Sequence, residues 1–392
     1  MNERNKSQEN EKGITLIALI VTIIIMVILA GITIKLAISD NGIIDNAKEA
    51  KDQYEESQIN GEKETTELAD YMKNNLGRIR TGAIVEDSTG GVPIPDGFYY
   101  VGGTKNSGLV ISDNSADKEK YKGKTTVGTD LIGNQFVWIP VDDIADYKRI
   151  AYSTNVATGE TDSTTNSEKI NYSSSSSNYF TEALSADEVA SVGKYKGFYI
   201  GRYEAGDKEC TAAQNLRTSS SGTTNTVTVK AGQAPYNWIS KTLAQSLAEK
   251  FSTKQGYTNV KSKLVSSYAY DTAIEFIQKT NSDYGNSSTE GNYSDTTFSY
   301  TDIKGENQTK EKGESIIIPT GQTMAVNNIY DMGGNVWELT TELYYGSNHT
   351  CTDRGGSFYN TFGFSSGSAG TRNSYYDEGN DNLGFRITLF MK

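Results

Sequence analysis

A long hydrophobic stretch separates the start of this chain from everything that follows. Between Ile14 and Ile34 no residue is charged, and most side chains are aliphatic. As a helix rising about 1.5 Å per residue, this stretch would measure about 31 Å, enough to cross a bilayer core of about 30 Å. The pattern predicts a transmembrane helix over residues 14–38, preceded by a polar leader over residues 1–13.

After residue 38 the apolar residues keep a helical spacing, but the positions between them become polar. Ile43, Ala47, Ala50 and Tyr54 fall on one face of a helix, and Glu and Lys occupy many of the other positions. We predict that residues 39–81 form a stalk helix.

From residue 82 onward the pattern is that of short strands. Runs of Val, Ile, Tyr and Phe alternate with turn residues such as Gly, Asn, Asp and Ser. The predicted strands include residues 97–101, 135–139 and 196–201, and two helical patterns cover residues 240–251 and 268–280. Because strands and helices do not alternate regularly, we predict an α+β domain over residues 82–392.

Two polar segments interrupt this domain. Residues 154–178 and 281–313 are rich in Ser, Thr and Asn and contain few large apolar side chains. Such segments bury too little apolar surface to order themselves, so we predict surface loops there.

Composition narrows the classes of function. The net charge is −12 and the pI is about 4.8, which argues against a nucleic-acid partner, because such partners require clustered Lys and Arg. The 25 Tyr and only 5 Pro are typical of a secreted bacterial surface protein. The two cysteines, Cys210 and Cys351, either form one disulfide or stay reduced, and the sequence leaves both alternatives open.

The start of the hydrophobic stretch carries a recognisable motif. Residues 12–17 read Lys-Gly-Ile-Thr-Leu-Ile, which resembles the leader of type IV pilins and pseudopilins. The resemblance implies that a prepilin peptidase cuts between Gly13 and Ile14, and that pilus subunits are partners. Ala18 stands where that family usually has a Glu that pairs with a neighbouring subunit, so a minor pilin or a simple anchor is favoured over a filament shaft. An ordinary transmembrane anchor without processing is the alternative.

This anchor would place the protein at the cell membrane. The basic residues Arg4, Lys6 and Lys12 precede the apolar stretch, and basic residues favour the cytoplasmic side. We therefore expect the domain over residues 82–392 to be extracellular.

Three motifs follow one another in the last seventy residues: 328–338 (NIYDMGGNVWE), 354–358 (RGGSF) and 382–386 (NLGFR). Their glycine pairs allow close backbone approach or positive φ. The ordered triplet resembles the formylglycine-generating enzyme (sulfatase-modifying factor) family, and residues 198–204 and 235–238 look like earlier motifs of that family. The resemblance covers about residues 95–392 and implies a C-type-lectin-like fold. We expect Trp337, Arg354, Phe385 and Arg386 to be structural.

The resemblance does not carry the family's activity with it. In that family two cysteines shortly after the Arg-Gly-Gly-Ser motif bind copper and oxidise a substrate cysteine. Here the corresponding positions are Asn360 and Ser365, while Cys351 precedes the motif. Without thiolates at those positions we expect no copper and favour a non-catalytic role. The only histidine, His349, argues against His-based metal clusters and is expected at the surface.

The same resemblance implies a calcium ion on the Asn-Val-Trp-Glu turn. Its ligands would be the Glu338 carboxylate and the backbone carbonyls of Gly333, Gly334 and Val336, which are oxygen ligands of the kind that Ca²⁺ takes. The alternative is that Glu338 hydrogen-bonds to the protein and no ion binds.

The segment between the second and third motifs has the composition of a binding surface. Residues 358–381 are rich in Tyr, Asn, Ser, Gly, Phe and Asp and nearly free of aliphatic residues and Lys, as in antibody paratopes. Together with the flanking Arg-Gly-Gly-Ser and Gly-Phe-Arg motifs, this segment resembles the variable proteins of diversity-generating retroelements, in which residues of these types are randomised. A polar loop on a protein with one fixed ligand is the alternative. The predicted ligand-binding residues are Phe358, Tyr359, Asn360, Phe362, Phe364, Arg372, Tyr375 and Tyr376.

Taken together, these patterns predict a membrane-anchored, surface-displayed and non-catalytic adhesin or receptor. Its expected ligand is an extracellular protein or a glycan. A structural subunit of a minor pilus or pseudopilus is one alternative. A formylglycine-generating-type oxidase is the other, and the missing cysteines disfavour it.

Overall fold

The computed structural model describes residues 19–30, 90–121, 126–152, 155–211, 225–286, 291–346, 348–361 and 367–392. The chain divides into two compact units, Met1–Arg78 and Ile79–Lys392, and each is considered by itself. The expected cleavage between Gly13 and Ile14 and the expected stalk at 39–81 lie outside the described residues and stay predictions.

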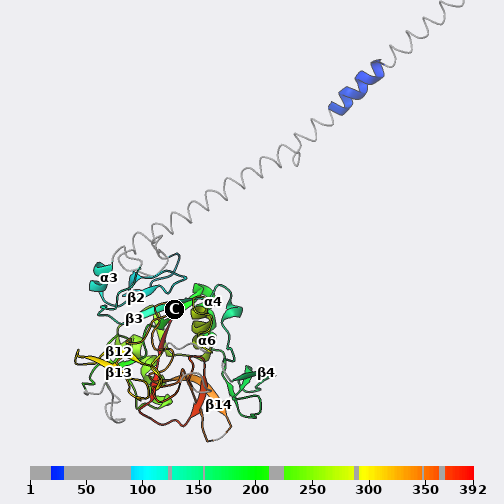
Figure 1. Ribbon diagram of the computed structural model, residues 1–392. Coiled ribbons are helices and arrows are strands. Elements are labelled where there is room, and N and C mark those ends of the chain that lie inside the picture. Colours follow the sequence, from blue (N-terminus) through cyan, green and yellow to red (C-terminus); the bar gives the residue numbers. More distant parts are fainter. Residues whose placement is uncertain are drawn as a thin grey trace, which may run out of the picture. The chain divides into compact units, whose positions relative to one another are not determined.

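In the first unit, residues 19–30 form a helix, drawn in blue in Figure 1. Its apolar side chains are exposed, with Met26 and Val27 at 64% and 65%. Among the described residues, no helix is long and apolar enough to cross a membrane. This finding contradicts the expected transmembrane helix over residues 14–38 and the expected location at the cell membrane with an extracellular domain.

The second unit contains a six-stranded antiparallel sheet that is buried on both faces. Its strands lie in the order β1 (Tyr99–Gly102), β2 (Val110–Ser112), β3 (Gln135–Pro140), β7 (Gly197–Gly201), β18 (Ile387–Met391) and β11 (Val260–Leu264). Successive side chains of a strand point to opposite faces. On β3, Phe136 and Trp138 join one hydrophobic cluster, and Val137 and Ile139 join the other. Because both faces are covered, these strands read as continuous apolar runs, and three of them were recognised from sequence.

Three helices cover the two faces: α4 (Ala186–Tyr195), α5 (Lys241–Lys254) and α6 (Ser267–Gln278). Leu247 and Phe251 of α5 enter the first cluster, while α4 and α6 contribute to the second. Serines cap two of them, since the Ser240 Oγ accepts a bond from the Leu243 N–H (3.3 Å) and the Ser266 Oγ from the Ala269 N–H (3.2 Å). The predicted helices at 240–251 and 268–280 are confirmed. The helices α3 (Ser115–Tyr121) and α4 and the short 3₁₀ helix η2 (Ile144–Asp146) were not predicted.

A second, seven-stranded sheet carries the C-terminal motifs. Its order is β16 (Arg372–Tyr375), β15 (Cys351–Arg354), β14 (Trp337–Tyr345), β6 (Tyr179–Thr181), β5 (Glu168–Asn171) and β4 (Val156–Thr161), with β17 (Leu383–Phe385) paired in parallel to β14. Two small sheets complete the unit: β10 (Ala234–Pro235), β8 (Gly206–Asp207) and β9 (Val227–Thr228), and the hairpin of β12 (Phe298–Thr301) and β13 (Asn307–Lys310).

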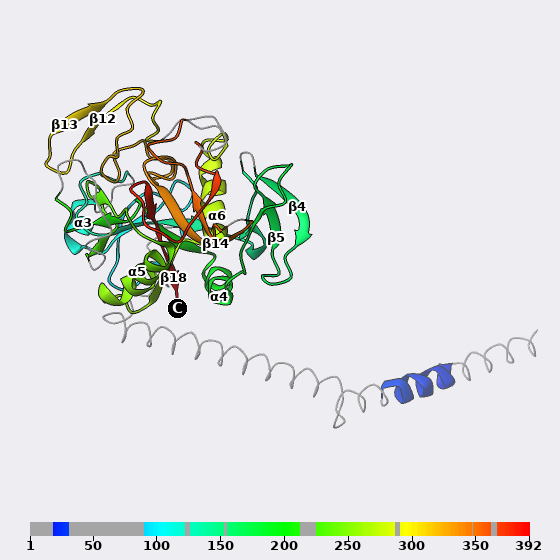
Figure 2. The same ribbon diagram turned by 90° about the horizontal axis from the view of Figure 1, so that it is seen from below.

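The predicted α+β class with an N-terminal transmembrane and stalk helix is wrong, because the described residues form mostly β-sheet with few helices. The Ser/Thr/Asn-rich segments explain part of the difference. Predicted as loops, they contain the β4–β5 and β12–β13 hairpins, which project from opposite sides of the unit in Figures 1 and 2. Main-chain pairing and side-chain hydrogen bonds, such as those that Asp162 and Asp302 accept, hold these hairpins. A small cluster around Ile170 and Phe180 packs beneath the first. Composition alone therefore underestimated the strand content.

Buried ion pairs connect the second sheet to its surroundings. Asp271 on α6 accepts a bond from Arg354 (2.5 Å) and another from Arg372, and Arg372 also reaches Glu342 on β14 (3.0 Å). All four side chains have no measurable exposure. Burial alone would raise the pKa of Glu342, but the charges of Arg372 and Arg149 lower it to about 2. Arg372, predicted to bind ligand, is therefore a structural residue.

We expect Arg372→Met to lower the free energy of unfolding by roughly 3–5 kcal/mol, because Asp271 and Glu342 would stay buried with one cation fewer. Lys105→Met removes a pair of similar length, 2.7 Å to Asp142, whose carboxylate is 78% exposed. That loss should be below about 1 kcal/mol. Denaturant unfolding of both variants measures the contrast, and equally small losses would contradict a stabilising role for the buried pairs.

Candidate functional site

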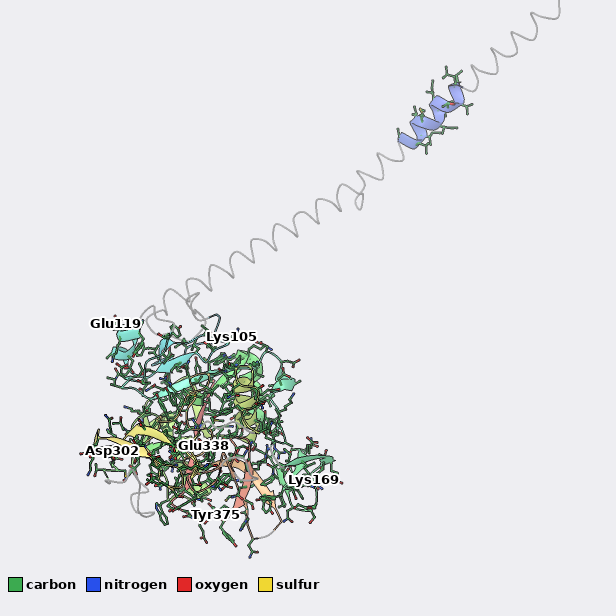
Figure 3. The ribbon with its side chains drawn as sticks, viewed as in Figure 1. Lys105, Glu119, Lys169, Asp302, Glu338 and Tyr375 are labelled. Atoms are coloured by element: carbon green, nitrogen blue, oxygen red, sulfur yellow. The ribbon has the colours of Figure 1, made fainter. Side chains whose placement is uncertain are left out.

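The three C-terminal motifs meet at Glu338. On β14 this residue lies opposite Arg354 of β15 on one side and Gly384 of β17 on the other. The strand register therefore brings together motifs that are separated by up to about fifty residues in sequence. Figure 3 shows Glu338 in the interior of the second unit.

The glycines of the motifs serve close backbone packing, as expected. Gly334 has φ +73°, and a Cβ there would lie 2.4 Å from the Asn292 carbonyl oxygen. Gly355 has φ +90°, and a Cβ there would lie 2.7 Å from the Met332 carbonyl oxygen. The backbone N–H of Gly334 donates to the Gly355 carbonyl oxygen at 2.8 Å, so the first two motifs touch directly through their glycines.

Buried polar side chains hold the same turn. The Asn335 Oδ1 accepts from the Asn292 amide (2.9 Å) and the Ile318 N–H (3.1 Å), and the Asn335 amide donates to Glu204. Glu204 is completely buried, and its second oxygen has no hydrogen-bond partner among the described residues. Burial, reinforced by Asp331, raises the pKa of Glu204 well above its ordinary value. Glu204 lies in residues 198–204, which resemble an earlier motif of the formylglycine-generating enzyme family, but the sequence alone assigned this carboxyl no role.

The predicted calcium ligands do not fit an ion as the turn stands. The Nε of Arg386 donates to both oxygens of Glu338 at 2.9 Å, and the side chains are 0% and 1% exposed. A cation on Glu338 would have to displace a buried guanidinium. Within the described ranges, no three His, Cys, Asp or Glu side chains are grouped so as to hold a metal ion. Gly333, Gly334, Val336 and Glu338 therefore do not provide an open calcium site in this arrangement.

The structure divides the eight predicted ligand-binding residues. Phe358 is buried and packs with Ile317 and Val336, and Arg372 belongs to the buried ion pairs. The Asn360 side chain accepts bonds from the backbone and hydroxyl of Ser357 at 2.8 and 2.9 Å, so it stabilises a turn. Phe362 and Phe364 lie outside the described residues. Tyr359, Tyr375 and Tyr376 are the ones that reach the surface.

Two hydrogen bonds and a ring contact connect these three tyrosines. The Tyr359 hydroxyl donates to Asp381 at 2.7 Å, and the adjacent Asn380 donates to the Tyr375 hydroxyl at 2.7 Å. Tyr375 and Tyr376 are in edge contact, with ring centroids 5.9 Å apart. Figure 3 shows Tyr375 at the rim of the unit. We call Tyr359, Tyr375, Tyr376, Asn380 and Asp381 the tyrosine surface.

His349 extends the tyrosine surface. Its ring is half-exposed and makes an edge contact with Tyr376, with centroids 4.3 Å apart, and its Nδ1 lies 2.9 Å from the Ser374 hydroxyl. The prediction of a surface position is confirmed. Sequence reasoning missed that His349, Asn380 and Asp381 lie beside the tyrosines, because only strand pairing brings residue 349 next to residues 374–376.

Cys351 is a buried thiol on β15 rather than a partner of Cys210 in a disulfide. Burial raises the pKa of the Cys351 thiol. A buried, protonated thiol is a poor nucleophile and a poor metal ligand. The described residues thus offer no reactive thiol beside the Arg-Gly-Gly-Ser motif.

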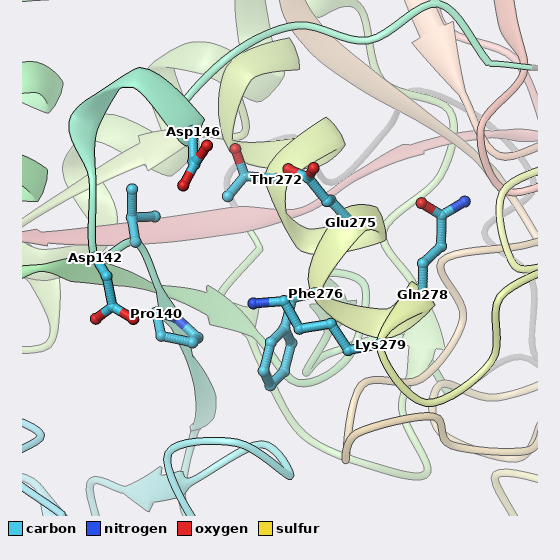
Figure 4. Close-up of a pocket in the computed structure, with 9 residues that line it drawn as sticks. Pro140, Asp142, Asp146, Thr272, Glu275, Phe276, Gln278 and Lys279 are labelled. Atoms are coloured by element: carbon cyan, nitrogen blue, oxygen red, sulfur yellow. The ribbon is translucent and has the colours of Figure 1, made fainter.

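A separate cavity of about 390 Å³ lies beside α6 and η2. In Figure 4, Asp146, Thr272 and Glu275 lie along one side, and the Lys279 side chain crosses near Phe276. Lys105 already pairs with Asp142 at this cavity (2.7 Å), and that bond lowers the pKa of Asp142. None of the predicted site residues lines the cavity, so we do not take it as the functional site.

A buried carboxyl, Asp353, lies on the strand between β14 and β16. Its Oδ2 accepts one long bond from the Asn373 amide (3.3 Å), and its Oδ1 has no partner among the described residues. Burial raises the pKa of Asp353 to about 7. Asp353 is therefore partly protonated at neutral pH.

No protein-family model matches the chain, and no curated protein matches its sequence. Among solved structures, the chain is similar to a crystal structure of CarF (13% identity, 50% of this chain and 87% of that chain, TM-score 0.35). It is also similar to PvdO from Pseudomonas aeruginosa (14%, 68% and 98%, 0.35) and to Treponema denticola variable protein 1 (14%, 67% and 97%, 0.30). At these TM-scores, nothing about the ligand or activity of this chain follows from the similarities.

The raised pKa of Asp353 predicts a loss of stability as pH rises. Asp353 binds its proton more tightly in the folded state than in the unfolded state, and this difference stabilises the folded state. The contribution has its full size below the ordinary pKa of 3.8 and is lost as pH rises toward 7. The slope from one such group is at most about 1.4 kcal/mol per pH unit. Asp353→Asn should make the fall between pH 4.5 and 7 shallower in denaturant unfolding. Equal slopes for the two proteins would contradict the assignment.

Proposed function

We propose that this protein is a non-catalytic ligand-binding protein and that the tyrosine surface contacts the ligand. The observation that supports the proposal is a set of contacts that joins Tyr359 to Tyr375 and Tyr376. Tyr359 and Tyr376 are 50% and 43% exposed, and Asp381, Asn380 and Tyr375 connect them through hydrogen bonds and a ring contact. Exposed aromatic rings held in place by polar contacts are typical of recognition surfaces.

The chemistry of this surface favours a neutral or cationic ligand, either a glycan or a protein. Tyrosine rings offer flat apolar area with a polar hydroxyl at the edge. Asp377, Glu378 and Asp381 add carboxylates in the same segment and disfavour anionic ligands. Hydrogen bonding to Asp381 raises the pKa of Tyr359 to about 12, so its hydroxyl keeps its proton at neutral pH.

The loop under the tyrosines is held before any ligand arrives. Both the backbone N–H of Thr242 (3.1 Å) and its hydroxyl donate to Asp377, which joins the loop to the start of α5. The backbone N–H of Trp238 donates to the Asn380 carbonyl oxygen at 2.8 Å, and the side-chain amide of Asn237 donates to the Asp381 carbonyl oxygen at 2.6 Å. A surface ordered in advance loses less conformational entropy on binding, which supports affinity.

Neither alternative function gains support from an observation of this kind. The hypothesis of a pilus subunit rests on leader residues outside the described ranges. The oxidase reading needs thiols at positions that hold Asn360 and Ser365. Asn360 holds a turn, and Ser365 lies outside the described residues.

Binding of the protein to glycan and protein arrays tests the proposal. For a ligand found there, Tyr359→Ala and Tyr376→Ala should each weaken binding at least about tenfold, the loss expected for a central aromatic contact of about 1.4 kcal/mol or more. Their melting temperatures should stay close to that of the parent protein, because both side chains are about half exposed and lie outside the hydrophobic clusters.

Tyr172→Ala is the matched control, since Tyr172 is 36% exposed and follows β5 in the other half of the second sheet. It should leave binding unchanged. Tyr359→Phe separates the ring from its bond to Asp381 and should weaken binding less than Tyr359→Ala. Full binding by both alanine variants would refute the tyrosine surface as the ligand site.

A further inference from the structure

A second cavity, of about 410 Å³, lies between α4 and the β11–β18 edge of the six-stranded sheet. Figure 2 shows α4 and β18 next to each other, close to residue 392. Phe390 contributes buried apolar surface from β18, and Ala190 and Tyr195 contribute from the helix. Met391 also lies at the cavity, but as the next residue of the strand its side chain points to the other face of the sheet. Its volume falls within the range of about 300–1,000 Å³ that is usual for small-molecule pockets.

A buried hydroxyl without a partner lines this cavity. Ser191 is 6% exposed, and its Oγ has no hydrogen-bond partner among the described residues. A serine within a helix commonly bonds to a carbonyl one turn earlier, and this one does not. Leaving a buried hydroxyl unpaired costs stability, so the Ser191 Oγ is positioned to meet a polar atom of a ligand.

The rim of the cavity is basic, although the chain as a whole carries a charge of −12. Its lining includes four lysine side chains and one acidic side chain, that of Asp187. Lys261 pairs with Asp187 at 2.7 Å, and Lys263 lies 3.2 Å from Glu188. Lys194 and Lys392 form no ion pair within the described ranges. The Lys194 ammonium lies 4.5 Å from the centre of the Tyr195 ring, and the Lys392 ammonium donates to the Thr258 carbonyl oxygen at 2.7 Å.

From this combination we infer a binding site for a small anionic amphiphile, that is, a molecule with an apolar body and a carboxylate or similar anionic head. The apolar body would lie against Phe390, Ala190 and Tyr195. The head would accept a hydrogen bond from Ser191 and the charge of Lys194, because charge-assisted bonds are the stronger kind. No residue of the tyrosine surface lines the cavity, so this site is independent of the proposed function.

Titration calorimetry of the full chain with decanoate, below its micelle concentration, tests the inference. Decyltrimethylammonium is the matched probe, with the same apolar length and the opposite charge. We expect saturable binding of decanoate with one site, and binding of the cation at least tenfold weaker. Equal affinity for the two probes would overturn the inference, because it would show that the basic rim plays no part.

Two variants locate the binding. Ser191→Ala should weaken decanoate binding about three- to tenfold while the melting temperature of the free protein stays the same or rises, since the variant removes an unpaired hydroxyl. Lys194→Glu should weaken binding at least tenfold. Lys304→Glu, an equal charge change on the exposed turn after β12, should leave binding unchanged.

The outcomes also separate this site from the tyrosine surface. If Tyr376→Ala abolishes decanoate binding, or if Lys194→Glu and Lys304→Glu behave alike, the cavity is not the site and the inference fails. Decanoate binding that survives Tyr376→Ala and is lost in Lys194→Glu supports it. Neither result depends on whether the tyrosine surface binds its own ligand.

Discussion

The pairing of buried arginines with buried carboxylates is the constraint on which the described domain depends. Arg354, Arg372 and Arg386 have fully buried side chains, and removing one partner of such a pair would leave a buried charge and strongly destabilise the fold. Glu338 must therefore meet Arg386, and Asp271 must meet Arg354 and Arg372. These contacts fix β14, β15, β16 and α6 relative to one another. The pairing of Arg386 also fixes the short segment between β17 and β18, where the chain passes from the seven-stranded sheet to the six-stranded sheet.

This constraint gives the C-terminal motifs a structural meaning. Glu338 and Arg386 pair with each other, Arg354 reaches α6, and Gly334 and Gly355 let the turns touch. Each of these roles concerns folding rather than chemistry. Motifs of this kind can persist on one architecture while the function changes, because function belongs to particular sites and not to the fold. The motif resemblance is therefore informative about which residues are buried and says little about what the protein binds.

The features that could be predicted from the sequence are those that depend on residues close together in the chain. Helices α5 and α6 and the apolar strands depend on local periodicity and serine caps, so they were visible in the sequence. The role of Arg372 was not, because its partners Asp271 and Glu342 lie 101 and 30 residues away. The hairpins β4–β5 and β12–β13 were missed because main-chain pairing leaves little trace in composition.

If the tyrosine surface binds a ligand as proposed, recognition and stability depend on different residues of the same segment. Between positions 358 and 381, Phe358 and Arg372 point into the interior, whereas Tyr359 and Tyr376 lie on the surface. The backbone at Asn380 and Asp381, which contact two of the tyrosines, is held by hydrogen bonds from Trp238 and Asn237. An exposed ring can then change without disturbing a buried ion pair. A rigid base with replaceable exposed side chains is what a binding surface needs in order to acquire a new ligand while the fold stays the same.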